Sequence, residues 1–348
     1  MHKFDYSFLE KGNVPASIVN ITGSIYSLRT AADIRKNENL SVFSGLQRIA
    51  KIQSVKSSNA IEGIRTSDDR LTAIVNQDSA PLNHNEAEIA GYRDALNIVH
   101  TQHDTLEFSI DMIRRLHETM MTLSGDDLAG QFKRTNNVIV EVGNDGSRSV
   151  RFRPVSAAET PAAMEQLELA YLDACSNSNI NPLLLIPCVI LDFLCIHPFR
   201  DGNGRVSRLL SLLLLYKAGF DVGKYVSFEE QINNYKEFYY ESLDQSSVGW
   251  DDNTNDYAPF LQNFLSTLYM CYKELDKRFA IYHSGKVNKT EQIEATVLNS
   301  LTPMSKANIC EILPDVSPTT VEAVLGRMVR AGQIRKIGAG RNTQYIKA

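Results

Sequence analysis

The chain has 348 residues, of which 43% are hydrophobic and 22% charged, as in a globular protein of two or three domains. Its net charge of −5 excludes a chain that binds polyanions over its whole surface, although residues from Gly285 onward carry nine Lys and Arg against five Asp and Glu. Five cysteines without CxxC spacing favour reduced thiols. No signal peptide and no membrane-spanning run are recognisable. We therefore expect a soluble, cytoplasmic protein without membrane contact.

Helical periodicity dominates the chain and predicts a mostly α fold. Residues 1–85 read as a helical region that ends in the loop "VNQDSAPLNHNEAEIAG", and a new helix begins near Glu86. Further on, Leu167, Tyr171 and Ala174 fall on one face of a helix, as expected for residues that pack into a core.

The stretch "NNVIVEVGNDGSRSVRFRPV" carries the one convincing β signal. Two β-prone segments flank Gly143 to Gly146, which predicts a hairpin turn. Charges on both arms (Glu141, Arg148 and Arg151) indicate a surface position. Such a ribbon either covers a core or pairs its edge with an extended segment of a target protein.

The stretch "DFLCIHPFRDGNGRVSRLLSLLLLY" (192–216) joins two apolar segments by a polar, flexible loop. Helices that are apolar on all sides belong in a core, so we predict a buried antiparallel helix pair with this loop at one end. Pro198 disfavours the helical conformation at His197, which therefore ends the first helix.

The loop has the composition of a phosphate site. Gly202, Asn203 and Gly204 can expose successive N–H groups at the start of the second helix. Arg205 and Arg208 lie in the first turns of that helix, where cations are unfavourable unless an anion docks beside them. A phosphate chain is the natural candidate.

Asp201 and His197 complete the candidate site. A carboxylate is a ligand that Mg²⁺ prefers, and histidine can take a proton near neutral pH. A nest of amides, two arginines, a metal carboxylate and a base together indicate phosphoryl or nucleotidyl transfer. A plain helix connector would not require this set of side chains.

Residues 285–348 change character. Three short helices are expected, with Ser305 and Ser317 as N-caps of the second and third, followed by a β-hairpin turning at residues 338–340. This order resembles a winged helix-turn-helix domain. Its recognition helix would start at Ser317, with Arg341 in the wing, although such domains also dock proteins.

The loop motif resembles one known family. "HPFRDGNGRVSR" (197–208) matches every defined position of HPFx(D/E)GNGRxxR, the signature of the Fic family of adenylyltransferases. "GQFKR" (130–134) resembles the approach to that family's target-positioning flap, and "NNYKEFYYESL" resembles its segment near adenine. The resemblance covers roughly residues 4–275. It implies a Fic-like helical core at 86–284 with a flap at about 133–154. The winged helix-turn-helix at 285–348 is expected from the pattern of its own helices and hairpin.

The resemblance also implies roles for the motif residues. His197 would deprotonate a target hydroxyl, and Asp201 would hold Mg²⁺. Phe199 would pack into the core and fix the loop, and one of the tyrosines at 235–240, most of them expected in the core, would contact adenine. The residues expected to bind ATP or its phosphates are Gly202, Asn203, Gly204, Arg205, Arg208 and Tyr240.

A second motif lies in the N-terminal region. Ser58, Glu62 and Gly63 match the family's inhibitory motif (S/T)xxxE(G/N), although Ser-x-x-x-Glu also occurs in ordinary capped surface helices. We expect Ser58 to cap a short helix and Glu62 to project from its next turn. The carboxylate of Glu62 would form a bidentate pair with Arg208 and so block the site for the γ-phosphate.

The resemblance implies Mg²⁺-dependent transfer of AMP from ATP to a Ser, Thr or Tyr hydroxyl of a target protein, with pyrophosphate released. It further implies autoinhibition, self-modification and dimers, and leaves the removal of AMP open. Two alternatives remain: transfer of another nucleotide, and a DNA-binding regulator whose Fic-like part senses nucleotide.

Overall fold

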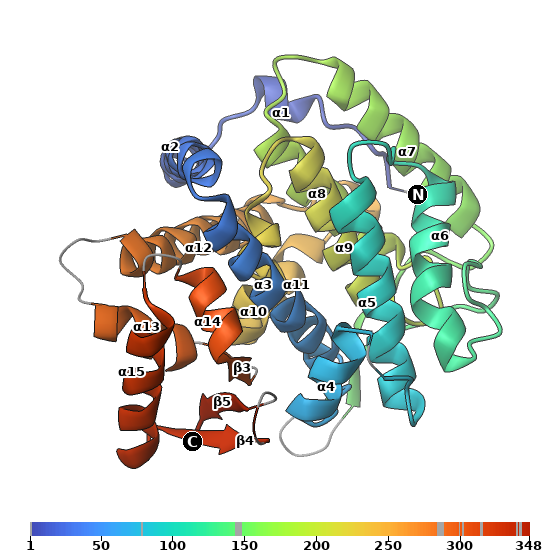
Figure 1. Ribbon diagram of the computed structural model, residues 1–348. Helices are drawn as coiled ribbons and strands as arrows, with labels where there is room; N and C mark the ends of the chain where they lie inside the picture. Colours follow the sequence, from blue (N-terminus) through green and yellow to red (C-terminus); the bar gives the residue numbers. More distant parts are fainter. Residues whose placement is uncertain are drawn as a thin grey trace.

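The computed structural model describes residues 2–77, 79–142, 148–283, 289–298, 300, 303–313, 316–338, 340 and 343–348. The fold is mostly helical, as the sequence predicts (Figure 1). The helices before the C-terminal segment are α1 (Phe8–Lys11), α2 (Ala16–Glu38), α3 (Leu40–Ile61), α4 (Asp68–Val75), α5 (His84–Gln102), α6 (Ile110–Met121), α7 (Thr160–Ser176), α8 (Pro182–Ile196), α9 (Asn203–Lys217), α10 (Phe228–Asn234), α11 (Lys236–Ser247) and α12 (Ala258–His283). Three 3₁₀ turns cover Thr122–Ser124, Val222–Lys224 and Trp250–Asp252.

The two apolar helices α8 and α9 lie in the core, as predicted. Every residue of α8 from Leu183 to Ile196 is buried, and α9 is buried from Arg205 to Tyr216. The two helices pack against each other, and the six-residue polar loop joins their ends. The predicted core face of α7 is also confirmed, since Leu167, Tyr171 and Ala174 are buried.

One acidic residue lies inside the apolar helix α8. Asp192 is fully buried and accepts hydrogen bonds of 2.8 Å from the hydroxyls of Tyr6 and Tyr257 and from the indole of Trp250. Burial raises the pKa of Asp192, while these donors and the nearby His2 act in the opposite direction. The carboxylate thus ties the N-terminal segment to the core helix.

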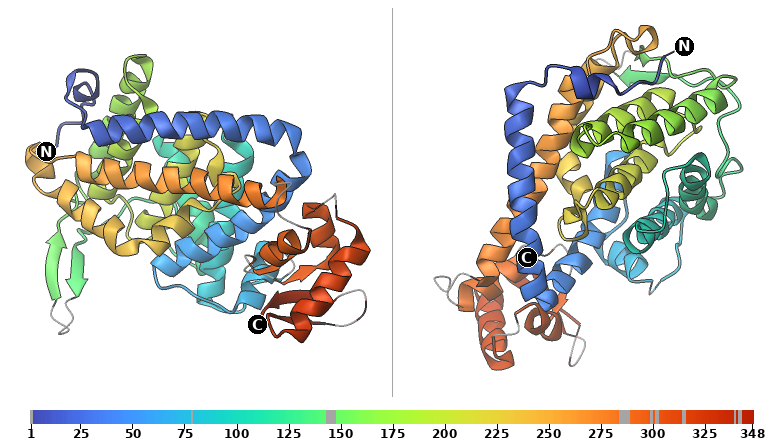
Figure 2. Two further views of the ribbon diagram at one scale, coloured as in Figure 1. Left: turned by 90° about the vertical axis from the view of Figure 1, so that its left-hand side faces the viewer. Right: turned by 90° about the horizontal axis from the view of Figure 1, so that it is seen from above.

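Long helices frame this core. Helices α2 and α12 run side by side over most of their length (Figure 2). Helix α3 spans from the C-terminal segment to the polar loop: Gly45 faces Ile312 so closely that an added Cβ would lie 2.6 Å from its Cγ1. The other end of α3 carries Ser58 and leads into Glu62.

The predicted hairpin is present. Strand β1 (Ile139–Val142) pairs antiparallel with β2 (Arg148–Phe152), and the register shifts between Ile139 and Val140. The hairpin projects from the helical body at the end opposite the C-terminal segment (Figure 2). The predicted turn at residues 143–146 lies outside the described residues.

The C-terminal segment contains α13 (Lys289–Leu298), α14 (Lys306–Ile312) and α15 (Pro318–Arg330). Ser305 and Ser317 cap α14 and α15, as predicted, because their side chains accept hydrogen bonds from Asn308 N and Thr320 N. Strands β4 (Ile334–Ile337) and β5 (Gln344–Lys347) pair as expected, and β3 (Met304–Ser305) adds a third strand in the order β3-β5-β4. A two-residue strand gives no sequence pattern, so β3 was missed.

The assignment of this segment as a winged helix-turn-helix stays a prediction. Arg341 and residue 339 of the expected turn lie outside the described residues. The described hydrophobic residues form one core cluster that runs from Tyr6 to Phe279 and a second from Ile293 to Tyr345. The boundary expected near residue 85 therefore falls within a continuous core, and the domain limits stay predictions. Among the described helices, none combines the length and apolarity needed to cross a lipid bilayer.

Candidate active site

The loop between α8 and α9 turns sharply at both ends. His197 ends α8 in the left-handed conformation, with φ of 51° and ψ of 60°. Gly202 precedes α9 with φ of 77°, a backbone conformation that glycine adopts without strain. The predicted helix end at His197 is therefore confirmed, and the loop doubles back between the two core helices.

Internal hydrogen bonds hold this loop. The side-chain amide of Asn203 accepts from Phe199 N at 2.9 Å and donates to Phe199 O at 2.8 Å. Phe199 is fully buried, as expected, and stacks on His117 with ring centroids 3.8 Å apart. Nε2 of His117 lies 3.1 Å from Asp201 O, while its Nδ1 accepts from Gly130 N. The Asn203 side chain thus fixes the loop, and the expected binding of phosphate by the backbone amides of Gly202, Asn203 and Gly204 stays a prediction.

The start of α9 provides free backbone donors. The N–H groups of Asn203 and Gly204 have no acceptor among the described residues, whereas Gly202 N donates to Asp201 Oδ1 at 2.6 Å. A side chain at position 204 would bring its Cβ within 2.6 Å of Glu62 Oε1. A carboxylate therefore already lies over the first turn of α9, where the helix dipole favours negative charge.

Arg208 is buried and its guanidinium has several partners. Its Nη2 lies 2.7 Å from Glu62 Oε1 and 3.0 Å from Ser58 O, and its Nε donates to Ser58 Oγ at 2.8 Å. Burial alone would raise the pKa of Glu62, but the charge of Arg208 and its hydrogen bond outweigh burial, so this pKa is lowered. Burial and Glu62 have opposite effects on the pKa of Arg208, and the net effect is a raised pKa.

The contact between Glu62 and Arg208 is confirmed, but its local structure differs from the expectation. Ser58 lies in the last turn of the long helix α3 and caps no short helix, since its hydroxyl binds Arg208. Glu62 is the C-cap residue and meets Arg208 through one carboxylate oxygen, so the pair is not bidentate. Gly63 follows with φ of 82°, and this left-handed position ends α3.

Arg205 does not converge with Arg208. Its guanidinium is 1% exposed, and Nη1 lies 2.5 Å from Oε2 of Glu88 on α5. Its Nη2 lies 3.5 Å from Asp201 Oδ2. The two guanidinium groups are thus apart in this structure, because each has its own carboxylate. That both arginines bind one phosphate chain stays a prediction. Glu88 had no sequence signal, since it lies far from the motif in the chain.

A cavity of about 250 Å³ opens beside the loop. His197, Gly204, Arg208 and Glu62 line one part of it. The remaining lining is largely apolar and comes from Ile139, Arg151, Phe152, Leu194, Cys195, Tyr239, Tyr240, Leu243 and Ser247. The cavity is smaller than the roughly 300–1,000 Å³ typical of small-molecule sites. The Glu62 carboxylate lies at the end of the cavity that faces the first turn of α9.

The tyrosines of α11 separate in space. Tyr239 is buried, Tyr240 is half-buried and lines the cavity, and Tyr235 is 46% exposed. As expected for most of them, Tyr239 belongs to the core and Tyr240 packs against it, whereas Tyr235 is exposed. Arg151 of β2 lies over the Tyr240 ring, 5.6 Å from its centroid, and pairs with Asp244 of α11.

The imidazole of His197 is neutral at pH 7. Burial, followed by the positive charge of Lys133, lowers the pKa of His197 to about 4. An imidazole with the ordinary pKa of 6.5 would be partly protonated at pH 7. With the lowered pKa, His197 stays neutral at that pH and keeps a lone pair. Lys133 belongs to the "GQFKR" stretch, but no pattern in the sequence assigns it a role.

Asp201 has the chemistry expected of a magnesium ligand. Its carboxylate is 68% exposed, and among the described residues no cluster of three or more His, Cys, Asp or Glu side chains could hold a metal alone. Mg²⁺ commonly binds through one or two carboxylates together with substrate phosphates and water. A single exposed carboxylate next to free helix amides fits that mode of binding.

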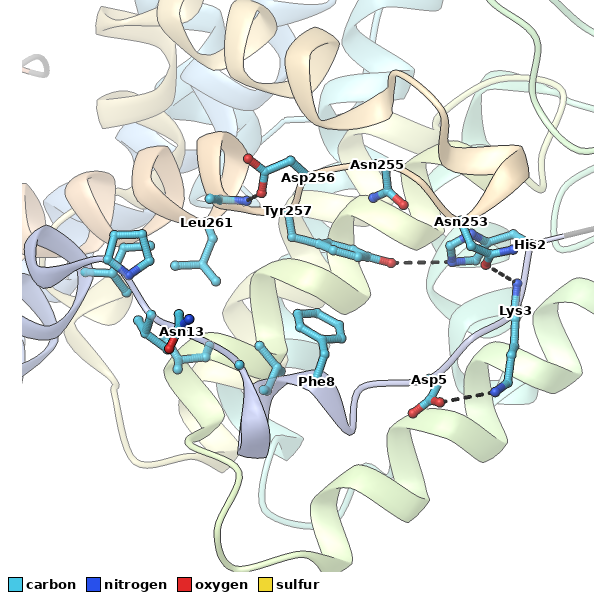
Figure 3. A pocket seen from close by; sticks show the side chains of 17 residues that line it. His2, Lys3, Asp5, Phe8, Asn13, Asn253, Asn255, Asp256, Tyr257 and Leu261 are labelled. Atoms are coloured by element: carbon cyan, nitrogen blue, oxygen red, sulfur yellow. Dashed lines mark hydrogen bonds and ion pairs between the residues drawn. The ribbon is translucent and has the colours of Figure 1, made fainter.

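A larger cavity of about 560 Å³ lies elsewhere (Figure 3). It is formed by the N-terminal segment, Leu184 of α8 and residues 253–261. Figure 3 shows Tyr257 pointing toward His2, and Lys3 between Asn253 and Asp5. None of the residues that the sequence predicts for the site lines it. Volume therefore does not identify the active site here, whereas the convergence of motif residues does.

Comparison with known sequences assigns the loop to a family. Residues 107–215, which include the whole motif, match the Fic/DOC family. Residues 107–215 thus correspond to a domain of the Fic/DOC family. Glu62, Ser58 and Tyr240 lie outside the matched residues.

Two curated relatives of the Fic domain are similar in sequence. The chain is 32% identical over 126 residues to protein adenylyltransferase fic-1 of Caenorhabditis elegans. The aligned residues make up 36% of this chain and 22% of that protein. It is 27% identical over 226 residues to protein adenylyltransferase Fic of Nematostella vectensis, and this alignment covers 61% of this chain and 46% of that protein. The chain therefore aligns with less than half the length of either relative.

Solved structures support the fold. A Fic family protein from Desulfovibrio desulfuricans superposes with a TM-score of 0.64 at 20% identity, covering 97% of both chains. A Fic-domain signaling protein from Bacteroides thetaiotaomicron gives 0.56 at 21% identity, covering 74% of this chain and 94% of that one. Fic-1 of C. elegans gives 0.56 at 20% identity, covering 75% and 72%. These similarities confirm a Fic-type helical fold.

Proposed function

We propose that this chain transfers AMP from ATP to a Ser, Thr or Tyr hydroxyl of a protein. The observation that carries the proposal is the convergence of His197, the free amide of Gly204 and Arg208 on one cavity. The similarity to two proteins named protein adenylyltransferase supports the same reaction. The apolar wall around Tyr240 suits a nucleobase.

In this reaction the residues of the loop bind, orient and move a proton. Neutral His197 accepts the proton of the target hydroxyl as its oxygen attacks the α-phosphorus. The bond from the α-phosphorus to the bridging oxygen breaks, and pyrophosphate leaves with the bonding electrons. The free N–H groups of Asn203 and Gly204 stabilise the charge that develops on the phosphate oxygens. The fixed loop contributes by holding base and phosphate in reacting geometry.

Mg²⁺ fits this site through Asp201. When bound, the ion would neutralise charge on the phosphates. The exposed carboxylate of Asp201 would hold it, and Arg208 would bind the terminal phosphate once Glu62 leaves. Arg205 connects the loop to α5, through its ion pair with Glu88 and its contact with Asp201.

The Glu62–Arg208 pair acts as an inhibitor within the chain. Glu62 occupies Nη2 of Arg208 and lies over the first turn of α9, where the phosphates would bind. Two negative groups cannot share this small space without strong repulsion. ATP would therefore bind in a productive pose only when Glu62 moves away.

Labelled ATP and the Glu62→Gly variant test the proposal. We expect AMP on the chain itself or on proteins of an added mixture, identified by mass spectrometry. The label should disappear in the double variant Glu62→Gly/His197→Ala. It should persist in the control Glu62→Gly/His103→Ala, because His103 is the C-cap residue of α5 and does not line the cavity. Parallel reactions with the other nucleoside triphosphates detect transfer of a different nucleotide. Folded Glu62→Gly protein that transfers no nucleotide under any condition would contradict the proposal.

A further inference from the structure

Lys133 is a buried lysine without an acidic partner among the described residues. Lys133 is only 4% exposed. Its ammonium nevertheless forms no ion pair with a carboxylate in the described part of the chain. Nζ donates instead to Ile196 O at 3.1 Å and to Asn137 Oδ1 at 3.0 Å. A buried charge without a counter-ion is costly, so such a lysine calls for a specific role.

The contacts of Lys133 surround one residue, His197. Its Nζ binds the carbonyl of Ile196, just before His197, and its backbone N–H donates to Pro198 O, just after it, at 2.9 Å. Asn137 extends the same contact, since its Nδ2 donates to Phe199 O at 3.3 Å. The segment that leads into the hairpin thus holds the backbone on both sides of His197.

This arrangement matches what His197 needs. His197 adopts the left-handed conformation that non-glycine residues rarely adopt, so its neighbouring peptides must be fixed from outside. Lys133 supplies two of the donors that fix them. The charge on its ammonium also disfavours a second positive charge on the imidazole.

We propose that Lys133 is a positioning residue for His197, which fixes the backbone on both sides of the imidazole and opposes its protonation through its own positive charge. This inference rests on the proposed function, in which His197 is the base. Removal of the Lys133 charge should therefore change how His197 titrates, beyond any loss of packing.

The charged groups around His197 set the sign of the effect. Burial lowers its pKa most, and Lys133 lowers it further, whereas Glu62 and Asp201 raise it. Burial also lowers the pKa of Lys133 to about 8, so its ammonium remains mostly charged at pH 7. Without Lys133, the two carboxylates act unopposed by this cation, and the pKa of His197 must rise.

The direct test is an NMR titration of His197 in histidine-labelled protein, with its signal identified by its loss in His197→Gln. In Lys133→Met we expect the pKa of His197 to rise by about half a unit or more, and in Lys133→Arg to stay near the wild-type value. The matched control is Lys217→Met, because Lys217 also donates to a backbone carbonyl, that of Leu106, but lies away from His197. An unchanged His197 pKa in folded Lys133→Met would overturn the proposal.

Two further measurements keep the test decisive. If Lys133→Met does not fold, Lys133→Gln replaces it, with folding checked by thermal unfolding. In the Glu62→Gly background, the acidic limb of the AMP-transfer rate should move to higher pH with Lys133→Met, while KM for ATP changes little. A role in folding alone would lower the rate equally at every pH and leave that limb in place. The titration needs no turnover, so absence of transfer in Glu62→Gly protein counts against the proposed function and not against this inference.

Discussion

Nη2 of Arg208 lies 2.7 Å from Oε1 of Glu62, although 146 positions separate the two residues in the chain. Helix α3 brings them together, because its last turn also offers Ser58 Oγ and Ser58 O to the same guanidinium. Arg208 thus makes three hydrogen bonds to the C-terminal end of one helix, in the position from which it would bind a phosphate. The predictions below follow from this contact and from the loop beside it.

Ser58→Ala should partly release Arg208. The variant removes the acceptor of the Nε hydrogen bond but leaves the carboxylate of Glu62 in place. A hydrogen bond of this kind contributes about 0.5–1.5 kcal/mol, so the AMP-transfer rate should rise about two- to tenfold. Ser57→Ala is the matched control, since Ser57 is also buried but has no hydrogen bond to Arg208. Equal rates for the Ser58→Ala variant and the wild type would argue against a role of Ser58 in inhibition.

The coupling between Glu62 and Arg208 should depend on pH. The folded-state pKa of Glu62 is lowered below its ordinary 4.5, so the pair stabilises the fold above that value and loses this effect as the pH falls through the lowered pKa. A double-mutant cycle with Glu62→Gln and Arg208→Gln should give about 1–3 kcal/mol at neutral pH. Urea unfolding at successively lower pH should show this coupling energy decline below about pH 4.5. A coupling energy that stays constant into the acidic range would contradict the assigned ion pair.

Asn203→Ala should destabilise the loop. The side-chain amide of Asn203 is the partner of both Phe199 N and Phe199 O in the interior, and its removal leaves the N–H without an acceptor. We expect a loss of about 1–3 kcal/mol in the free energy of unfolding and a strong loss of AMP transfer. Asn234→Ala, at the exposed end of α10, is the control. If Asn203→Ala unfolds at the wild-type urea concentration, the loop does not depend on this amide.

Glu88→Ala should be more destabilising still. It leaves the guanidinium of Arg205 buried without its main counter-ion, a change that typically costs about 3–5 kcal/mol. Calorimetric unfolding measures this loss directly. Glu118→Ala, an acid on the neighbouring helix α6 that forms no ion pair in the described structure, is the control. A small loss, comparable to that of the control, would mean that Arg205 is readily solvated or has another partner.

The sequence predicted the parts of the site that lie close together in the chain. The spacing of apolar residues indicated the buried helices α8 and α9, and Pro198 placed the end of α8 at His197. The contact from Glu62 to Arg208 was also expected, but only because both ends belong to motifs of a known family. Physical reasoning on Ser58 alone favoured a cap on a short helix, which was wrong because its hydroxyl has a distant partner.

The rest depends on contacts between distant segments, which no local pattern reveals. Glu88 and His117 come from α5 and α6, yet they hold Arg205 and the backbone of Asp201. The sequence therefore placed Arg205 beside Arg208, whereas buried charge pairing turned the two side chains apart. Lys133 was visible in the sequence as one more cation, and only its burial shows that it differs from a surface lysine.

Isothermal titration calorimetry of Glu62→Gly protein with magnesium and ATP tests the central claim most directly, namely that the start of α9 and Arg208 form a site for a nucleoside triphosphate. We predict saturable binding to one site per chain, lost when Arg208→Ala is added and weaker in the chain that retains Glu62. Absence of heat with ATP and with every other nucleoside triphosphate, in protein shown to be folded, would contradict the account.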